Sequence, residues 1–526
     1  MSSSPSARPQ RRTRVSFLRL LVLLVALGAI GWFGFKATVA AVIPPATPGP
    51  STFSPYVDVT AWPPYRFETP SDPSAMDVTL AFIVADPAQP CEPSWGGYYS
   101  LDAASSEIEL DRRIQQLRTV GGDVRVSFGG AANSELAVTC DNTNRLLDAY
   151  RAVVNRYELS IIDLDIEGAA LADDAANVRR AEAIKLLQEE SAEAGKDLSV
   201  WLTLPVGPQG LTAEGEQVVS GMLDAGVEVT GVNGMAMVFG LTTSASNPQS
   251  DTIVDSANAL HAQVTRLFAA AGEQLSVRDA WTRVGITVMI GQNDVETERF
   301  TLADAEAVNQ FARDNGVGLV SMWSLNRDTT CVAPLPTVTT VVQDNCSGVD
   351  QGGVSFAETL ALDLPLAGQV RQADTPDPSA SPSVSPTQAA AAPVAPADIV
   401  DDPAKSPYPI WEPLGTYPAG TKIVWRKNVY EARYWTSGFA PDTAVANPYD
   451  SPWTLLGPVL PGDKPAPLPT LPAGSYPDWD AEEVYVAGDR VLLDLVPYEA
   501  KWWTQGQKPG VAIEGGSPWL LILPAG

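Results

Sequence analysis

The chain has 526 residues, and its 62 acidic against 34 basic side chains give a formal net charge of -28. A surface this acidic repels nucleic-acid phosphates and anionic lipid headgroups, so we expect no nucleic-acid partner. The single histidine, His261, excludes most Ser/His/Asp and Cys/His nucleophilic schemes and any multi-histidine metal site. Carboxylates must therefore carry the chemistry, and we expect neither a metal nor another cofactor.

Residues 1–50 have the pattern of an export segment. Five arginines between Arg8 and Arg19 precede an uncharged run of sixteen residues from Leu20 to Phe35. The apolar character resumes after Lys36, so a cleaved signal peptide and an uncleaved anchor both stay open, with the anchor favoured. Either form places the rest of the chain outside the cell, secreted or tethered to the outer face of the membrane by an N-terminal helix.

The four cysteines agree with export, because none has the CxxC spacing of zinc or redox sites. Two disulfides are expected. Of the three pairings that four cysteines allow, we favour Cys91 with Cys140 and Cys331 with Cys346, since the latter pair closes a short loop.

Residues 53–365 alternate short apolar runs with longer stretches of helical period, a pattern that indicates parallel strands joined by crossover helices. Strands are predicted at 56–61, 77–85, 123–130, 160–167, 198–205, 229–238, 283–290 and 317–325. Amphipathic helices are predicted at 109–120, 143–157, 176–195 and 301–316. Eight such units favour an α/β fold, the (β/α)8 TIM barrel, over a doubly wound open sheet, because no GxGxxG motif follows the first strand.

The fourth predicted strand carries the strongest chemical signal. Asp163, Asp165 and Glu167 alternate with Leu164 and Ile166, so a strand places all three carboxylates on one face, toward the barrel interior. Three neighbouring acids repel each other when ionised. At least one of them should therefore keep a proton near neutral pH, as a general acid requires.

The rest of the chain divides into two linkers and two small all-β modules. Residues 366–405 are rich in Pro, Ala and Ser and read as a linker, and a second proline-rich linker covers 458–474. Shifting the chain by 68 positions superimposes Trp411, Tyr417, Tyr430 and Trp435 on aromatic residues of the same type. Modules at 406–457 and 475–526 are thus two copies of one unit.

The strand IIDLDIEG resembles the DxxDxDxE strand of family 18 glycoside hydrolases, with Glu167 in the proton-donor position. Four further segments are similar to motifs of that family in the same order: SFGG at 127–130, TLPVGPQGLT from Thr203, VMIGQND from Val288 and MWSLNRD from Met322. These motifs span roughly residues 53–330. The resemblance implies a bacterial-type chitinase barrel with a retaining, substrate-assisted mechanism.

The resemblance also implies roles for single residues. Glu167 would protonate the glycosidic oxygen, Asp165 would orient the substrate's acetamido group, and Asp163 would tune that pair electrostatically. Trp323 would form the floor under the distorted sugar, and Gln292 would supply a polar sugar contact. Met237 of the sixth strand is a further expected substrate contact.

Two segments depart from the family pattern. Ser160 stands at the first Asp of the DxxDxDxE strand, and MAMVF places Val238 and Phe239 where relatives carry Asp and Tyr. Loss of one buried polar contact commonly costs about 1 to 3 kcal/mol. A weakened enzyme, or a non-catalytic chitin-binding surface protein, is therefore an alternative function.

The repeated modules resemble type 3 chitin-binding domains, the carbohydrate-binding module family 5/12, through ARYWTSG at 432–438 and AKWWTQG at 500–506. Of the adjacent aromatics, Tyr434 with Trp435 and Trp502 with Trp503, we expect one of each pair to pack and the other to stack on sugar rings. The expected partner of this monomeric protein is chitin or its oligosaccharides. An endo-β-N-acetylglucosaminidase acting on other GlcNAc-containing glycans is a further alternative.

Overall fold

The computed structural model describes residues 52–364, 401–403, 405–443, 451–465, 467–510 and 517–522. The predicted export segment at 1–50 and most of the first linker lie outside these described residues. Within the described part of the chain, no helix has both the length and the apolar character needed to cross a membrane.

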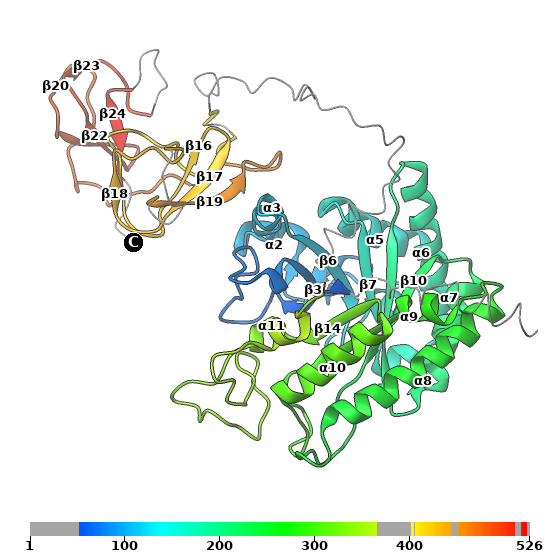
Figure 1. Ribbon diagram of the computed structural model, residues 1–526. Coiled ribbons are helices and arrows are strands. Elements are labelled where there is room, and N and C mark those ends of the chain that lie inside the picture. Colours follow the sequence, from blue (N-terminus) through cyan, green and yellow to red (C-terminus); the bar gives the residue numbers. More distant parts are fainter. Residues whose placement is uncertain are drawn as a thin grey trace, which may run out of the picture. The chain divides into compact units, whose positions relative to one another are not determined.

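All eight predicted barrel strands are present, and Figure 1 shows them inside a layer of helices. They are β2 (Tyr56–Asp58), β3 (Asp77–Ala85), β6 (Asp123–Gly129), β7 (Ile161–Asp165), β8 (Ser199–Gly207), β10 (Val229–Met235), β11 (Val284–Met289) and β14 (Leu319–Trp323). Neighbouring strands pair in parallel. The short strand β1 (Thr52–Phe53) pairs with β14 while β2 pairs with β3, so one strand position, divided between β1 and β2, closes the ring. The predicted TIM barrel is confirmed, and the open sheet is wrong.

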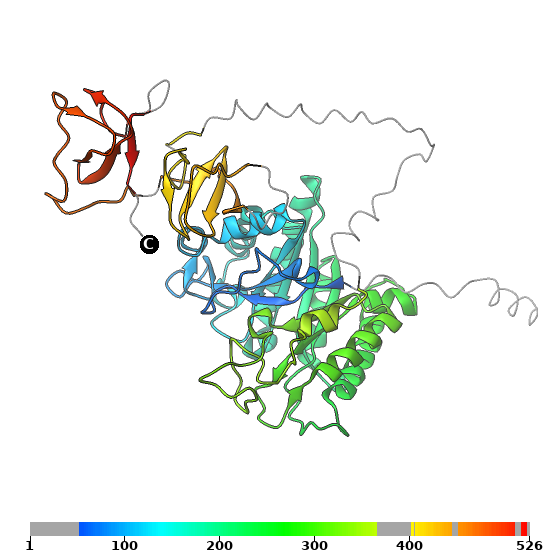
Figure 2. The same ribbon diagram turned by 60° about the vertical axis from the view of Figure 1, so that its left-hand side comes forward.

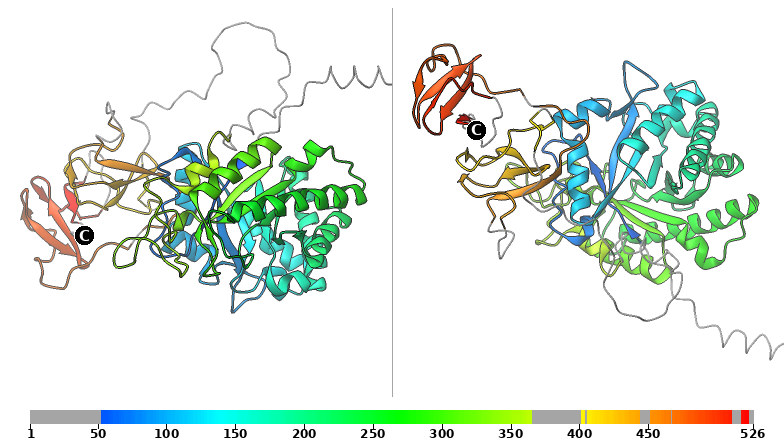
Figure 3. Two further views of the ribbon diagram at one scale, coloured as in Figure 1. Left: turned by 60° about the horizontal axis from the view of Figure 1, so that its bottom comes forward. Right: turned by 90° about the horizontal axis from the view of Figure 1, so that it is seen from above.

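The helices lie outside the ring of strands, as the views along different directions show (Figure 3). They are α2 (Leu101–Glu107), α3 (Leu110–Thr119), α4 (Leu136–Thr139), α5 (Thr143–Arg156), α6 (Asp174–Glu193), α7 (Ala213–Asp224), α8 (Gln249–Ala270), α9 (Val277–Thr282), α10 (Leu302–Asn315) and α11 (Phe356–Ala361). The four predicted helices correspond to α3, α5, α6 and α10. Polar caps fix several helix starts; for example, Thr301 and Asp304 form a capping box at α10.

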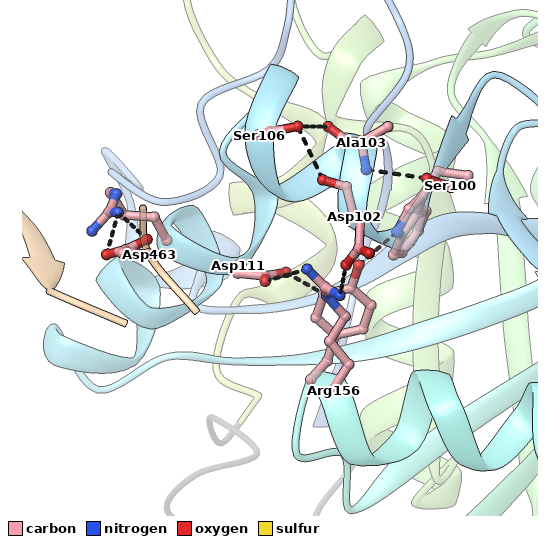
Figure 4. Close-up of polar contacts among 10 residues, drawn as sticks. Ser100, Asp102, Ala103, Ser106, Asp111, Arg156 and Asp463 are labelled. Carbon is pink, nitrogen blue, oxygen red and sulfur yellow. Dashed lines mark hydrogen bonds and ion pairs between the residues drawn. The ribbon is translucent and has the colours of Figure 1, made fainter. Parts of the chain in front are cut away.

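Ion pairs tie neighbouring helices together on the outer surface. Arg156, in the last turn of α5, donates to Asp111 of α3 and to Asp102 of α2 (Figure 4). Ser100 caps α2 by accepting from the Ala103 backbone N–H. A cation in the last turn of a helix also interacts favourably with the helix dipole. These contacts hold the helices that follow β3 against the helix that follows β6.

Short antiparallel strands extend the barrel at its loops. β4 (Pro93–Trp95) pairs with β3 and with β5 (Tyr99–Ser100), β9 (Gly210–Leu211) pairs with β8, and β12 (Gly291–Gln292) pairs with β13 (Arg299–Phe300). Short 3-10 helices form at η1 (Pro73–Ala75), η2 (Gly168–Ala172) and η3 (Leu325–Arg327). Both predicted disulfides, Cys91–Cys140 and Cys331–Cys346, are confirmed.

Each C-terminal module is a small β structure with its own core (Figure 2). The first contains β15 (Thr416–Tyr417), β16 (Lys422–Trp425), β17 (Asn428–Ala432), β18 (Thr436–Ser437) and β19 (Trp453–Pro458), and the second contains β20 (Val484–Tyr485), β21 (Arg490–Leu493), β22 (Val496–Ala500), β23 (Thr504–Gln505) and β24 (Trp519–Leu521). In both, a three-stranded antiparallel sheet lies beside a two-stranded one. The hydroxyls of Tyr417 and Tyr485 accept from the backbone N–H groups of Glu412 and Asp480, each at 2.7 Å. The internal repeat is therefore a repeat of structure.

Candidate active site

The three carboxylates of β7 alternate with apolar residues as the sequence predicts. Asp163 and Asp165 are buried in the barrel interior, while Leu164 and Ile166 are buried in the hydrophobic core. Glu167 follows the end of β7 and keeps an extended backbone, with φ -141° and ψ 173°. Its side chain therefore continues the inward row and lines a cleft at the carboxyl end of the strands.

Asp163 accepts hydrogen bonds from side chains of three other strands, the two neighbours of β7 and β2 across the barrel. Tyr56 of β2 donates to Oδ2 at 2.8 Å, Ser127 of β6 donates to Oδ2 at 2.7 Å, and Thr203 of β8 donates to Oδ1 at 2.6 Å. Burial raises the pKa of the Asp163 carboxyl, and these three donors act in the opposite direction because they stabilise its anion. Asp163 is thus a buried carboxylate whose anion is stabilised by three protein hydroxyl groups.

Asp165 has the opposite environment. It is buried, and its Oδ1 has no hydrogen-bond partner within the described part of the chain. Burial, followed by the negative charges of Glu167 and Asp163, raises the pKa of Asp165 well above the usual range. Asp165 therefore keeps its proton more readily than Asp163, and its Oδ1 is a buried acceptor without a partner among the described residues.

Glu167 can serve as an acid from the same cleft. Partial burial raises the pKa of its carboxyl, because the anion loses hydration there. A raised pKa keeps the carboxyl protonated toward neutral pH, which a proton donor needs. The expectation that the row holds at least one proton agrees with these shifts.

The cleft has a volume of about 470 Å³ and an aromatic floor. Trp323, at the end of β14, stacks on Phe82 of β3 with ring centroids 5.4 Å apart and planes inclined by 17°. Tyr56 packs against both rings at centroid distances of 6.0 and 6.1 Å. Trp323 thus lies where the sequence places a sugar-stacking residue, beside the acids at the carboxyl end of the strands.

One wall of the cleft is apolar and includes the altered segment that follows β10, which ends at Met235 and not at the predicted Val238. Met237 and Val238 line the cleft, as expected for Met237, and Val238 is 41% exposed. Val238 has φ +55°, in the left-handed region that disfavours a β-branched residue. The buried carboxylate of Glu298 holds the following turn by accepting from the backbone N–H groups of Phe239, Gly240 and Leu241 at 2.9 to 3.1 Å.

The position of Gln292 corrects the expected sugar contact. Gln292 is fully buried outside the cleft, and its amide donates to the backbone carbonyls of Asn293 and Val295 and accepts from Arg299. Gly291, with φ +68°, turns the chain just before it, so that Gln292 packs inward instead of lining the cleft.

Other cleft residues were not anticipated from the sequence. Tyr56, Phe82, Thr203 and Asp294 line the cleft, and two of them, Thr203 and Asp294, stand in the segments TLPVGPQGLT and VMIGQND without having been singled out as site residues. Inward-facing positions on β2, β3 and β8 were the signal that could have identified the first three. The described residues contain no group of three or more His, Cys, Asp or Glu side chains that could hold a metal ion.

The aromatic pairs of the modules are more exposed than predicted. Tyr434 and Trp435 are 50% and 62% exposed, and Trp502 and Trp503 are 43% and 62% exposed. The expectation that one residue of each pair packs into the core is wrong. Both pairs lie in short connections between strands, β17 to β18 and β22 to β23, so the in-out alternation of a strand does not apply to them.

Comparisons with known proteins agree with this geometry. A model of carbohydrate-binding module family 5/12 matches residues 478–520. The chain is 36% identical over 289 residues to a probable bifunctional chitinase/lysozyme of Escherichia coli and 35% identical over 257 residues to endochitinase 11 of Metarhizium anisopliae. These alignments cover 52% and 48% of this chain but only 31% and 47% of the two relatives.

A solved structure gives the same assignment for the barrel. The catalytic domain of a hyperthermophilic chitinase from Pyrococcus furiosus is 25% identical, with a TM-score of 0.50, and the match covers 60% of this chain and 95% of that domain. The closed barrel with its row of carboxylates is thus that of a glycoside hydrolase. It is similar to the catalytic domains of chitinases, and residues 478–520 match carbohydrate-binding module family 5/12.

Proposed function

We propose that the protein hydrolyses β-1,4 bonds between N-acetylglucosamine units of chitin and retains the anomeric configuration. The observation that carries this proposal is the row of Asp163, Asp165 and Glu167 in a cleft whose floor is the stacked pair Trp323 and Phe82. An aromatic face suits the C–H groups of a pyranose ring, and Asp165 lines the cleft, where its carboxyl suits an acetamido N–H.

In this mechanism the substrate supplies the nucleophile. The acetamido carbonyl oxygen attacks C1 while the bond from C1 to the glycosidic oxygen breaks and that oxygen takes the proton of Glu167. A positively charged oxazolinium results, and the net negative charge of the Asp163 and Asp165 pair stabilises it. Water then attacks C1 and gives a proton to Glu167, which restores the acid and the acetamido group.

The proposal is tested by Glu167→Gln, which keeps the shape of the side chain but removes its acid. We expect hydrolysis of a fluorogenic chitobioside and of chito-oligosaccharides to fall at least about 100-fold, with chitin binding unchanged. Glu193→Gln, at an exposed position on α6, is the matched control and should keep full activity. Unchanged turnover by the Glu167 variant would contradict the assignment.

A non-catalytic chitin-binding protein is the second candidate, favoured by the apolar Val238 in the cleft. In that case the wild-type protein binds chitin but does not hydrolyse the chitobioside. Release of reducing ends from N-glycan cores or peptidoglycan, measured in parallel, distinguishes an enzyme acting on other GlcNAc-containing glycans.

We further propose that the protein works as a monomer outside the cell, secreted or held at the outer membrane face by residues 1–50. The arginine-rich start followed by an apolar run and the two disulfides support this location. Added protease should degrade the protein on intact cells, or the protein should be found in the medium. Protection from protease on intact cells and absence from the medium would contradict it.

A further inference from the structure

A line of buried polar side chains crosses the barrel below the cleft. From Asp163 it runs to Thr203 of β8, then to Asn233 of β10, then to Thr287 of β11. Asn233 is completely buried and does not line the cleft, whereas Thr203 and Thr287 do. The mechanism proposed above uses Asp163 but gives no role to Asn233.

The hydrogen bonds along this line have a definite direction at Thr203. Asn233 Nδ2 donates to Thr203 Oγ1 at 2.9 Å, and Thr203 Oγ1 lies 2.6 Å from Asp163 Oδ1. A hydroxyl has one proton, and an ionised carboxylate can only accept. Thr203 Oγ1 also lies 3.2 Å from the hydroxyl of Tyr56, whose own proton goes to Asp163 Oδ2. With the amide N–H on Thr203 Oγ1, the hydroxyl proton of Thr203 is directed to the nearer oxygen, Asp163 Oδ1.

The remaining contacts place the Asn233 amide in a site built for it. Thr287 Oγ1 lies 2.7 Å from Nδ2 and donates to Oδ1 at 3.0 Å. Gly285 of β11 stands opposite Asn233, and a Cβ on Gly285 would come within 2.8 Å of Asn233 Oδ1. Glycine at position 285 thus leaves room for the amide of Asn233.

We infer that Asn233, held by Thr287, is a positioning residue that fixes the Thr203 hydroxyl as a donor to Asp163 and so keeps the negative charge of the pair on Asp163 rather than on Asp165. The inference rests on the proposed function for its catalytic consequence. The pair then carries one net negative charge below the place where the oxazolinium forms, and Asp165 is neutral when substrate enters.

Several charged or titratable groups act on Asp163. They are Tyr56 from β2, Arg125 from β6 and Asp165 from its own strand, while Glu167 acts on Asp165. β8 and β10 contribute the neutral Thr203 and Asn233. An apolar replacement of Asn233 therefore changes no charge near Asp163, and any effect on its titration must pass through hydrogen bonding.

The test is a double-mutant cycle on the full chain labelled with 13C at aspartate carboxyls, in which the Asp163 signal is assigned by its loss in Asp163→Asn. Asn233→Leu and Thr203→Val should each raise the titration midpoint of Asp163 by about one pH unit. The double variant should shift no further than Thr203→Val alone, because the amide acts only through the hydroxyl. An unshifted midpoint in Asn233→Leu, or additive shifts in the double variant, would overturn the inference.

This titration does not depend on turnover, so it decides the inference even if the wild-type protein hydrolyses nothing. If the wild type is active, Asn233→Leu should lower kcat/KM about tenfold and displace its pH profile in the same direction as the Asp163 midpoint. Should Asn233→Leu fail to fold, Asn233→Ala removes the same amide without adding bulk, and its titration is interpreted by the same criteria.

Discussion

The phenol hydroxyl of Tyr56 lies 2.8 Å from Oδ2 of Asp163, so the first strand of the barrel supports the acid of the fourth. Burial raises the pKa of this phenol well above its usual range, and the charges of Asp163 and Asp165 act in the same direction. Tyr56 therefore stays protonated and remains a donor over the whole working pH range.

Tyr56→Phe removes this donor and leaves the ring that packs on Trp323. We expect kcat/KM on a chitobioside to fall about tenfold, because a hydrogen bond to a charged group contributes roughly 1.5 to 3 kcal/mol. Tyr65→Phe, on a tyrosine that does not line the cleft, is the control. Equal activity of the Tyr56 variant and the wild type would show that the hydroxyl is dispensable.

Asp165→Asn should stabilise the fold at neutral pH. The pKa of Asp165 is higher in the folded protein than in the unfolded chain. The contribution of this carboxyl to the free energy of unfolding is therefore complete below the pKa of the unfolded chain, and it is lost as the pH rises through the folded-state pKa. Asparagine does not ionise, and the variant should therefore gain about 1 kcal/mol or more near pH 8 and nothing near pH 3. Thermal unfolding across this range measures the difference, and a gain independent of pH would be inconsistent with a buried titrating acid.

Two substitutions of Val238, to Asn and to Asp, distinguish the effect of backbone strain on stability from the effect of a carboxylate on catalysis. The left-handed conformation of Val238 suits Asn and Asp better than a β-branched residue, so Val238→Asn should raise stability by about 1 kcal/mol. Val238→Asp should give a similar gain and, by adding a carboxylate to the cleft, raise kcat/KM about fivefold or more over Val238→Asn. Identical kinetics for the two variants would mean that a carboxylate at this position does not assist turnover.

Trp435→Ala and Trp503→Ala should weaken binding to insoluble chitin without affecting hydrolysis of soluble oligosaccharides. Both side chains are 62% exposed, so their loss should change the unfolding temperature little. The double variant should bind more weakly than either single variant. Its loss of binding free energy should exceed the sum of the two single losses, because two linked modules raise each other's effective concentration at the chitin surface. Pull-down on chitin measures this, and undiminished binding by the double variant would exclude these rings from the sugar contact.

The periodicity of the sequence was enough to predict the barrel and the acid row. Alternation of Asp163, Asp165 and Glu167 with apolar residues depends only on the two-residue period of a strand, which is a local property. The hydrogen bonds of Tyr56 and Thr203 to Asp163 depend on the register between strands, which no local pattern contains. Such partners can be predicted only once the strands are aligned.

The two errors in the site have local causes that override periodicity. Gly291 has a left-handed backbone conformation, with φ +68°, just after β11, so that Gln292 is buried outside the cleft instead of lining it. The aromatic pairs that begin at Tyr434 and Trp502 follow the ends of their strands, where side chains no longer alternate between two faces. In both cases the position of the strand end, and not the residue type, determines where the side chain points.

The carboxylate of Glu298 holds the turn that follows Val238 of the cleft wall, so this end of the wall has its shape before any sugar arrives. Its three backbone contacts fix Phe239, Gly240 and Leu241, and each fixed residue represents about 1 to 2 kcal/mol of conformational entropy already lost on folding. A ligand that touches this wall need not order it, so more of the contact free energy becomes affinity. A wall that is already ordered can select one conformation of the sugar ring even though it has few polar groups.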